Sequence, residues 1–212
     1  MITASTALLV LNKNPRYYLN QLMAITLIFF ALFFGLEAPI YILPPDVVIA
    51  NLLRKTFLSC SVIAASLFLA TALVMYLGVR RLKPVMAVML PVAVIIGIIG
   101  SLSVSVTMVD GELQTTNVNA LLASLSFYVY PFCCLMVAFY IFWQVYKQIG
   151  EDEVTKKRIR LILIGITSIL IGIIYFVVKE YIFPSGSMGD LPTIFGHVFY
   201  IAGDIFIFVS FK

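Results

Sequence analysis

Long unbroken apolar runs, separated by short polar breaks, dominate the chain. Each run is about as long as the ~20 residues that a helix needs to cross a bilayer. None shows the strict alternation that is typical of barrel strands. The pattern predicts six full transmembrane helices, with approximate limits Leu19–Leu43, Asn51–Val79, Val85–Val109, Ala120–Tyr146, Arg160–Phe183 and Thr193–Phe211.

A shorter apolar segment precedes these six runs. Residues 2–11 read ITASTALLVL, which is too short to span a bilayer alone, and a turn with two positive charges, Asn12–Arg16, follows it. The segment is either a shortened first helix, which is the favoured interpretation, or an interfacial segment. The chain is therefore predicted to be one all-α integral membrane domain over residues 1–212, a polytopic helix bundle with six full spans and a possible shortened seventh.

Composition supports this class. Hydrophobic residues make up 62% of the 212 residues and charged residues 11%, with a mean hydropathy of +1.09. Soluble domains carry roughly 25% charged residues. The net charge of +4 does not indicate nucleic-acid binding, because the positive residues gather on one side of the predicted spans. The three cysteines lie within apolar runs, so neither a disulfide nor a metal site is expected.

The orientation follows from the distribution of lysine and arginine. Cytoplasmic loops carry an excess of these residues. One side of the predicted spans holds eleven of the fourteen, namely Lys13, Arg16, Arg80, Arg81, Lys83, Lys147, Lys156, Lys157, Arg158, Arg160 and Lys212. The other side holds Arg54, Lys55 and Lys179. We therefore expect a multi-pass protein of the cell membrane, with the basic loops and the C-terminus in the cytoplasm.

One polar segment combines both signs of charge. The triplet Glu151–Glu153 precedes four basic residues at the start of a helix, where the helix dipole favours acidic groups. Asp152–Lys156 and Glu153–Lys157 have the i,i+4 spacing of helical ion pairs. The segment is a candidate contact for a cytoplasmic signalling protein, and an anchor that only fixes topology is an equally good interpretation. The candidate contact residues are Glu151, Asp152, Lys156, Lys157, Arg158 and Arg160.

Small residues recur four positions apart in several of the spans. The pairs are Ala31–Gly35, Ser66–Ala70, Gly97–Ser101, Ser101–Ser105 and Ser168–Gly172. This spacing lets helix backbones approach closely in lipid. It indicates packing and does not indicate a function.

Two stretches carry a resemblance to a known family. They are LVLNKNPRYYLNQLMAITLIFFALFFGL at residues 9–36 and FYIFWQVYKQIGEDEVTKKRIRLILIGITSILIGI at residues 139–173. Together they resemble the N-terminal seven-helix membrane region of bacterial and archaeal histidine kinases. The matching features are the basic turn Asn12–Arg16, the helix-opening Asn20 and the acidic-then-basic inner loop. No kinase or cyclase domain follows Lys212, so the resemblance implies either the sensing module alone or a fragment of a longer chain, with an output that requires a partner.

Ionisable residues within the apolar runs are candidates for a site, because charge inside lipid is costly. His197, Tyr200 and Asp204 share one helical face, and Asp204 lies about 18 Å along the last helix. One hypothesis is an outward-opening pocket for a small polar or amphipathic ligand. The other is that these groups pair with one another to hold the bundle together. For Arg54 and Lys55, contact with lipid headgroups is the preferred interpretation. The candidate residues are Glu37, Tyr41, Arg54, Lys179, His197, Tyr200 and Asp204.

The leading functional prediction is a non-enzymatic membrane sensor or receptor-like module that passes a ligand or membrane signal to a cytoplasmic partner. A small structural subunit of a larger membrane complex is the first alternative, and a small transporter or channel is the second. No catalytic motif or phosphate-binding loop is present, and the single histidine excludes bis-histidine haem and a multi-histidine metal site. We therefore expect no catalytic residue, cofactor or metal.

Overall fold

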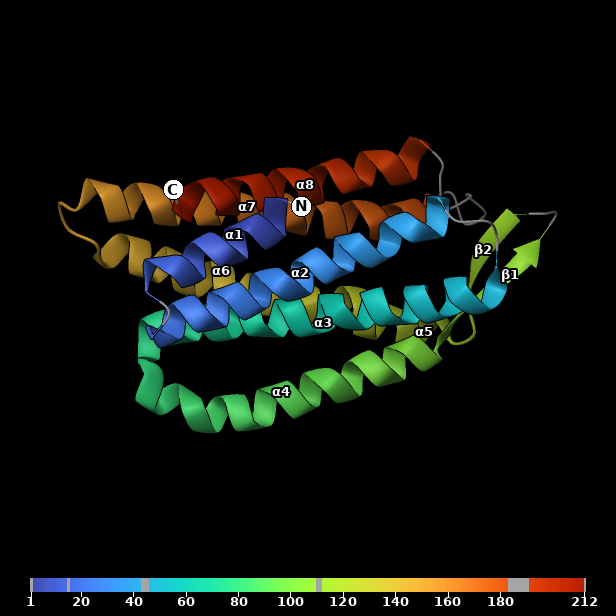
Figure 1. The fold of residues 1–212 in the computed structure, drawn as a ribbon, viewed down its shortest axis with the longest axis horizontal. Coiled ribbons are helices and arrows are strands. Elements are labelled where there is room, and N and C mark those ends of the chain that lie inside the picture. Colours follow the sequence, from blue (N-terminus) through green and yellow to red (C-terminus); the bar gives the residue numbers. More distant parts are fainter. Residues whose placement is uncertain (1, 15, 43–45, 110–111, 183–190, 212) are drawn as a thin grey trace.

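The protein is a bundle of seven helices in a computed structural model, which describes residues 2–14, 16–42, 46–109, 112–182 and 191–211 (Figure 1). Its helices are α1 (Ile2–Lys13), α2 (Tyr18–Ile42), α3 (Val47–Leu77), α4 (Val79–Leu102), α5 (Ala120–Ser124), η1 (Leu125–Val129), α6 (Tyr130–Gln148), α7 (Glu153–Ile182) and α8 (Leu191–Phe211). Because α5, η1 and α6 follow one another without a break, they count as one helix. The prediction of an all-α bundle is confirmed, with one short hairpin added.

Five of these helices are long and apolar enough to cross a membrane, so the chain is a multi-pass membrane protein. They lie in α2, in α3, in α4, over Ala120–Gln148 and in α7. The sequence predicts a sixth full span, but the described apolar part of α8, Phe195–Ser210, is a shorter helix. The predicted first helix is confirmed: α1 has 12 residues and packs along α2 and α8, with Ala7 and Val10 buried.

The helices run back and forth along the long axis, so that two ends of the bundle can be distinguished (Figure 1). The basic end holds residues 14, 16 and 17, Gly78 and residues 149–152, together with the adjoining helix ends. The hairpin end holds the β-strands, the start of α3 and the start of α8. At the basic end, the α6–α7 hairpin extends beyond the other helices. This arrangement separates the two groups of basic residues as the sequence predicts, apart from Lys212, which lies outside the described residues. The membrane side that each end faces stays a prediction.

Helix α3 lies at the centre of the bundle and α4 lies at its edge. α3 contributes Phe68 to the main core, where it meets Phe142 of α6 with ring centroids 5.8 Å apart. On α4, by contrast, large apolar residues such as Val88, Ile95 and Leu102 are exposed. In a membrane protein these side chains face lipid or another protein.

The connection between α3 and α4 differs from the prediction. The basic stretch at residues 80–84 is expected to be the turn, but it lies inside α4 and Gly78 alone separates the helices. Gly78 has φ 79° and ψ 160°, a conformation that is essentially restricted to glycine. The chain therefore reverses at the one residue that can adopt this geometry, and Arg80, Arg81 and Lys83 follow in the first turns of α4.

The end of α4 also differs from the prediction. The helix is expected to continue to Val109, but it ends at Leu102, and strands β1 (Val104–Val109) and β2 (Glu112–Asn117) form an antiparallel hairpin. The β-branched residues of β1 favour a strand. The Asn51 side chain of α3 donates to Val106 O at 2.8 Å and accepts from Val106 N at 2.7 Å. These two bonds attach the hairpin to α3.

Proline changes the helix that follows the hairpin. Pro131 has no N–H to donate to the preceding turn. The five residues before α6 form a π-helical turn, in which Tyr130 N donates to Leu125 O. The wider turn takes up the disruption, so the helix continues through a proline inside the span.

Helices α7 and α8 approach each other more closely than side chains normally allow. A Cβ atom added to either Gly165 or Gly203 would lie 2.8 Å from the carbonyl oxygen of the other residue. Two turns away on the same faces, Gly172 packs against Tyr200, and Gly196 packs against Phe176. Between them, the Ser168 hydroxyl donates to Phe199 O at 2.7 Å. These contacts join α7 and α8 into one unit.

Candidate functional site

A buried carboxylate near the hairpin end connects three helices. Glu37 of α2 is only 7% exposed. Its Oε2 lies 2.9 Å from Nε2 of His197 on α8, and its Oε1 lies 3.9 Å from a guanidinium nitrogen of Arg54 on α3. An ionised carboxylate can only accept hydrogen bonds, so in that state Nε2 of His197 carries the shared hydrogen. We call Glu37, Arg54 and His197 the carboxylate cluster.

Arg54 packs inside the bundle, whereas the preferred interpretation of its sequence position is contact with lipid headgroups. Its side chain is 20% exposed, and the guanidinium carbon sits 4.7 Å above the ring of Phe57. Phe57 is buried on the same helix one turn later. The aromatic ring and the Glu37 carboxylate thus both stabilise the positive charge inside the bundle.

An aromatic shell surrounds the cluster on the side of α7 and α8. Tyr200 stacks on Phe176 of α7, with centroids 5.7 Å apart and planes 10° apart, and its ring also meets Phe33 and Phe34 of α2. Phe176 contacts the His197 ring edge to face at 5.2 Å. These apolar walls lower the local dielectric, which strengthens the interactions of the cluster.

The structure brings together four of the seven predicted site residues. Of the other three, one lies further along α8 and one on α7, and the side chain of the third is not described. Glu37, Arg54, His197 and Tyr200 lie together, as described above. Asp204 is buried at 8% exposure, two turns further along α8 from His197. Lys179 lies in the last turn of α7, half-buried. The side chain of Tyr41 lies outside the part of the chain that the structure describes.

The cluster offers no arrangement for holding a metal. Within the described ranges, no three side chains of histidine, cysteine, aspartate or glutamate lie close enough together to hold one ion. Chemically, the cluster is an ionic and hydrogen-bonded junction. A ligand with its own carboxylate or amine would compete for Glu37 or for Arg54.

The predicted partner segment lies at the other end of the bundle. Asp152 caps α7, accepting hydrogen bonds from the N–H groups of Val154 and Thr155 and, at 2.6 Å, from the Thr155 hydroxyl. That hydroxyl bond and the backbone bonds hold the pKa of Asp152 below its ordinary value of 3.8. The predicted acidic start of α7 is thereby confirmed. The Lys156 ammonium lies 5.8 Å from the ring centroid of Tyr146.

Aromatic residues complete this basic end. Trp143 and Tyr146 stack with centroids 5.8 Å apart, and the Lys147 ammonium lies 5.3 Å from the centroid of the Trp143 ring. The Lys156 ammonium lies near the Tyr146 ring, so each ring of the stacked pair has one lysine beside it on the α6–α7 hairpin. Most of the candidate contact residues are exposed: Glu151, Asp152, Lys157, Arg158 and Arg160.

Comparison with protein-family models finds no match, and comparison with curated protein sequences also finds none. The resemblance to the histidine-kinase membrane region therefore rests on the two sequence stretches alone.

Two features of the site are absent from the sequence-based prediction. The aromatic shell of Phe33, Phe34 and Phe176 carries no polar signal, and each residue looks like ordinary lipid-facing or core sequence. The second feature is Asn51, near the site. Its bonds to the hairpin depend on strand β1, where the sequence predicts a helix. The alternation of buried Val104 and Val106 with polar neighbours, followed by Asp110-Gly111, is the signal that favours a hairpin there.

Proposed function

We propose that the protein is a non-enzymatic membrane sensor whose input is received at the carboxylate cluster and whose output is presented at the basic end. The observation that carries the proposal is the junction itself. One buried carboxylate joins α2 to α8 through His197 and faces Arg54 of α3. A buried charged junction costs desolvation free energy, and specificity or switching is the best-attested use of such an arrangement.

The packing of α8 supports a route between the two ends. His197 connects α8 to α2, whereas the close approach of Gly165 and Gly203 connects α8 to α7. When a ligand separates His197 from Glu37, α8 loses a polar contact with α2 but keeps its contact with α7. The two helices then move as a unit, and the start of α7 lies in the charged α6–α7 hairpin. In this proposal the basic end faces the cytoplasm, in accord with the positive-inside rule.

Electron paramagnetic resonance distances test this coupling. Spin labels at Arg81 and Lys157, both exposed at the basic end, report the separation of α4 and α7 in a background with the three cysteines replaced. His197→Gln should shift the distance distribution by roughly 1–2 Å, the scale of helix shifts in allosteric proteins. Lys55→Gln, which removes a charge beside Arg54 without touching the cluster, is the control. Identical distributions in all three proteins would contradict the coupling.

Native mass spectrometry separates the sensor from the complex subunit. Protein extracted gently from its own membrane should retain a small molecule in the wild type and lose it in Glu37→Gln and Arg54→Gln, but not in Lys55→Gln. A protein partner at fixed stoichiometry, with no small molecule, would instead favour the subunit. The exposed apolar face of α4 is one surface available for such a partner.

A further inference from the structure

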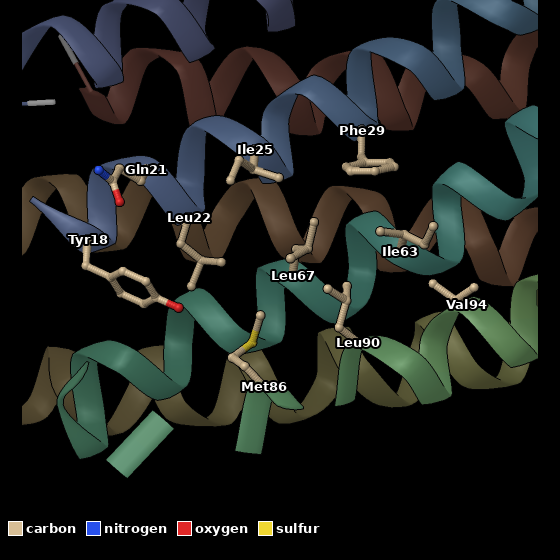
Figure 2. Close-up of a pocket in the computed structure, with 10 residues that line it drawn as sticks. All are labelled: Tyr18, Gln21, Leu22, Ile25, Phe29, Ile63, Leu67, Met86, Leu90 and Val94. Atoms are coloured by element: carbon tan, nitrogen blue, oxygen red, sulfur yellow. The ribbon is translucent and has the colours of Figure 1, made fainter. Parts of the chain in front are cut away.

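A groove of about 340 Å³ opens between α2, α3 and α4, away from the carboxylate cluster (Figure 2). Its α2 wall runs from Tyr18 to Phe29 and its α4 wall from Met86 to Val94, while Leu67 of α3 lies between them. Figure 2 shows the Tyr18 ring reaching from α2 toward α3 and α4. The groove is apolar except for Tyr18 and Gln21, which both lie toward the basic end.

The length of the groove matches one leaflet of a bilayer. Tyr18 and Phe29 are eleven residues apart on α2, which corresponds to about 16 Å along a helix at 1.5 Å per residue. The hydrocarbon core of a bilayer is about 30 Å thick. An occupant that fills the groove therefore has about the length of one leaflet's hydrocarbon layer.

Three exposed basic residues precede, in the chain, the lining residues at the basic end of the groove, and their charge complements an anionic headgroup. Lys83 precedes Met86 by one helical turn on the face of α4 that lines the groove, and Arg80 lies one turn before Lys83. Arg16 lies two residues before Tyr18, with which the α2 wall begins. All three basic residues are exposed. Basic pockets between transmembrane helices are recognition sites for anionic lipid headgroups.

We propose that this groove binds an anionic glycerophospholipid from the leaflet at the basic end. One acyl chain lies between α2 and α4 along Phe29, Leu67 and Leu90. The phosphate lies near Lys83 and Arg80, and the hydroxyl of Tyr18 and the amide of Gln21 are placed for the glycerol ester region. The occupant links α4, the helix at the edge of the bundle, to the rest of the protein.

Native mass spectrometry with two added lipids tests the proposal. Purified protein is titrated with phosphatidylglycerol or with phosphatidylcholine of identical acyl chains. Because each basic residue near a membrane surface strengthens binding about fivefold, phosphatidylglycerol should bind at least fivefold more tightly. Lys83→Gln should weaken phosphatidylglycerol binding about fivefold and leave phosphatidylcholine binding unchanged. Lys157→Gln, which removes one charge from the same end but away from the groove, should have no effect.

Variants that fill the groove locate the acyl chain. Leu90→Trp on α4 and Ile25→Trp on α2 each place a large ring between the walls and should reduce phosphatidylglycerol binding at least tenfold. Val88→Trp is the control, because Val88 lies on the exposed face of α4, two residues from Leu90. Thermal unfolding of each variant shows which remain folded. One folded variant of the two, Leu90→Trp or Ile25→Trp, is enough to test the position of the acyl chain.

Two results would overturn the proposal. Equal affinity for both lipids would leave no role for the basic mouth, and equal effects of Leu90→Trp and Val88→Trp would place the lipid elsewhere on α4. A groove that binds neither lipid, in a protein that is folded, would also overturn it.

Discussion

The α7–α8 pair and the α3–α4 pair are both antiparallel neighbours, but they close in different ways. α7 and α8 meet backbone to backbone, and neither Gly165 nor Gly203 has room for a Cβ atom. α4 approaches α3 closely at its hairpin-end half, where the Ser59 hydroxyl donates to Gly97 O at 3.2 Å. In its other half, Met86 and Leu90 line an open groove.

The difference follows from where small residues lie. In lipid there is little hydrophobic force between helices, so close backbone approach and interhelical hydrogen bonds provide most of the association free energy. Glycines recur along the facing sides of α7 and α8, but on α4 Gly97 and Gly100 occur only near the hairpin end. The first pair is thereby fixed as a unit, whereas the second leaves space that a lipid can fill.

The largest expected effect breaks the α7–α8 contact. A Cβ at Gly203 would lie 2.6 Å from Cγ1 of Ile169 and 2.8 Å from the Gly165 carbonyl oxygen. Gly203→Val should therefore destabilise the protein by about 3 kcal/mol or more, measured by unfolding in detergent. Gly35→Val is the matched control, because nothing lies within 4 Å of a Cβ at Gly35. Equal stabilities of the two variants would show that the contact is looser than described.

The second effect tests how the hairpin end of the α3–α4 pair is held together. Asn51→Ala removes both bonds to Val106 and leaves the backbone N–H and C=O of this buried residue without these partners, at a cost of about 2 kcal/mol. Hydrogen exchange at the Val106 amide should accelerate markedly. Thr107→Ala, an exposed change on the same strand, should leave that exchange rate unchanged.

The third effect compares the close approach at Gly100 of α4 with the close approach at Gly203 of α8. A Cβ at Gly100 would lie 2.5 Å from Cβ of Ser126 and 2.7 Å from the Phe127 ring. Gly100→Ala should cost about 1 kcal/mol, less than Gly203→Val, because side-chain atoms move more easily than a helix backbone. Adding Ser126→Gly should restore part of the loss. A double variant with no recovery would contradict the geometry of this contact.

The smallest effect lies at the exposed start of α7, outside both contacts. The pKa of Asp152 is lowered by its bond from the Thr155 hydroxyl. A lowered pKa means that the ionised group stabilises the folded state above its ordinary pKa of 3.8 and that this contribution is lost as pH falls through the lowered value. The melting temperature of the wild type should therefore fall slightly more below pH 3.8 than that of Asp152→Asn. Thr155→Val should reduce this difference. Parallel curves of melting temperature against pH for the wild type and Asp152→Asn would show that Asp152 makes no such contribution.

Much of the fold could be predicted from hydrophobic run length, because a bilayer imposes a minimum length on every span. The short helix α1 and the separation of basic residues follow from the same pattern. The break at Gly78 could not be predicted from the sequence. The basic residues after it resemble a turn, although they also suit the first turns of a helix. The hairpin was missed because Val104–Val109 continues the apolar run of α4.

The candidate site was predictable only in part. Inward charges such as Glu37 and His197 are conspicuous because charge is rare within apolar runs. Their pairing with Arg54 depends on how three helices rotate against one another, which periodicity does not fix. The predicted small-residue pairs show the same limit: Gly172 does pack against α8, but a Cβ atom added at Gly35 would meet nothing within 4 Å, and Ser105 lies in a strand.

Gly78 also constrains the order of events by which the protein enters the membrane. A single residue joins helices of 31 and 24 residues, which leaves no slack for one to be threaded across the bilayer and completed before the other begins. We therefore expect α3 and α4 to enter the bilayer together as a helical hairpin, and the positive-inside rule predicts that Arg80, Arg81 and Lys83 stay on the cytoplasmic side. A longer linker at this position would release that requirement and allow each helix to be inserted by itself.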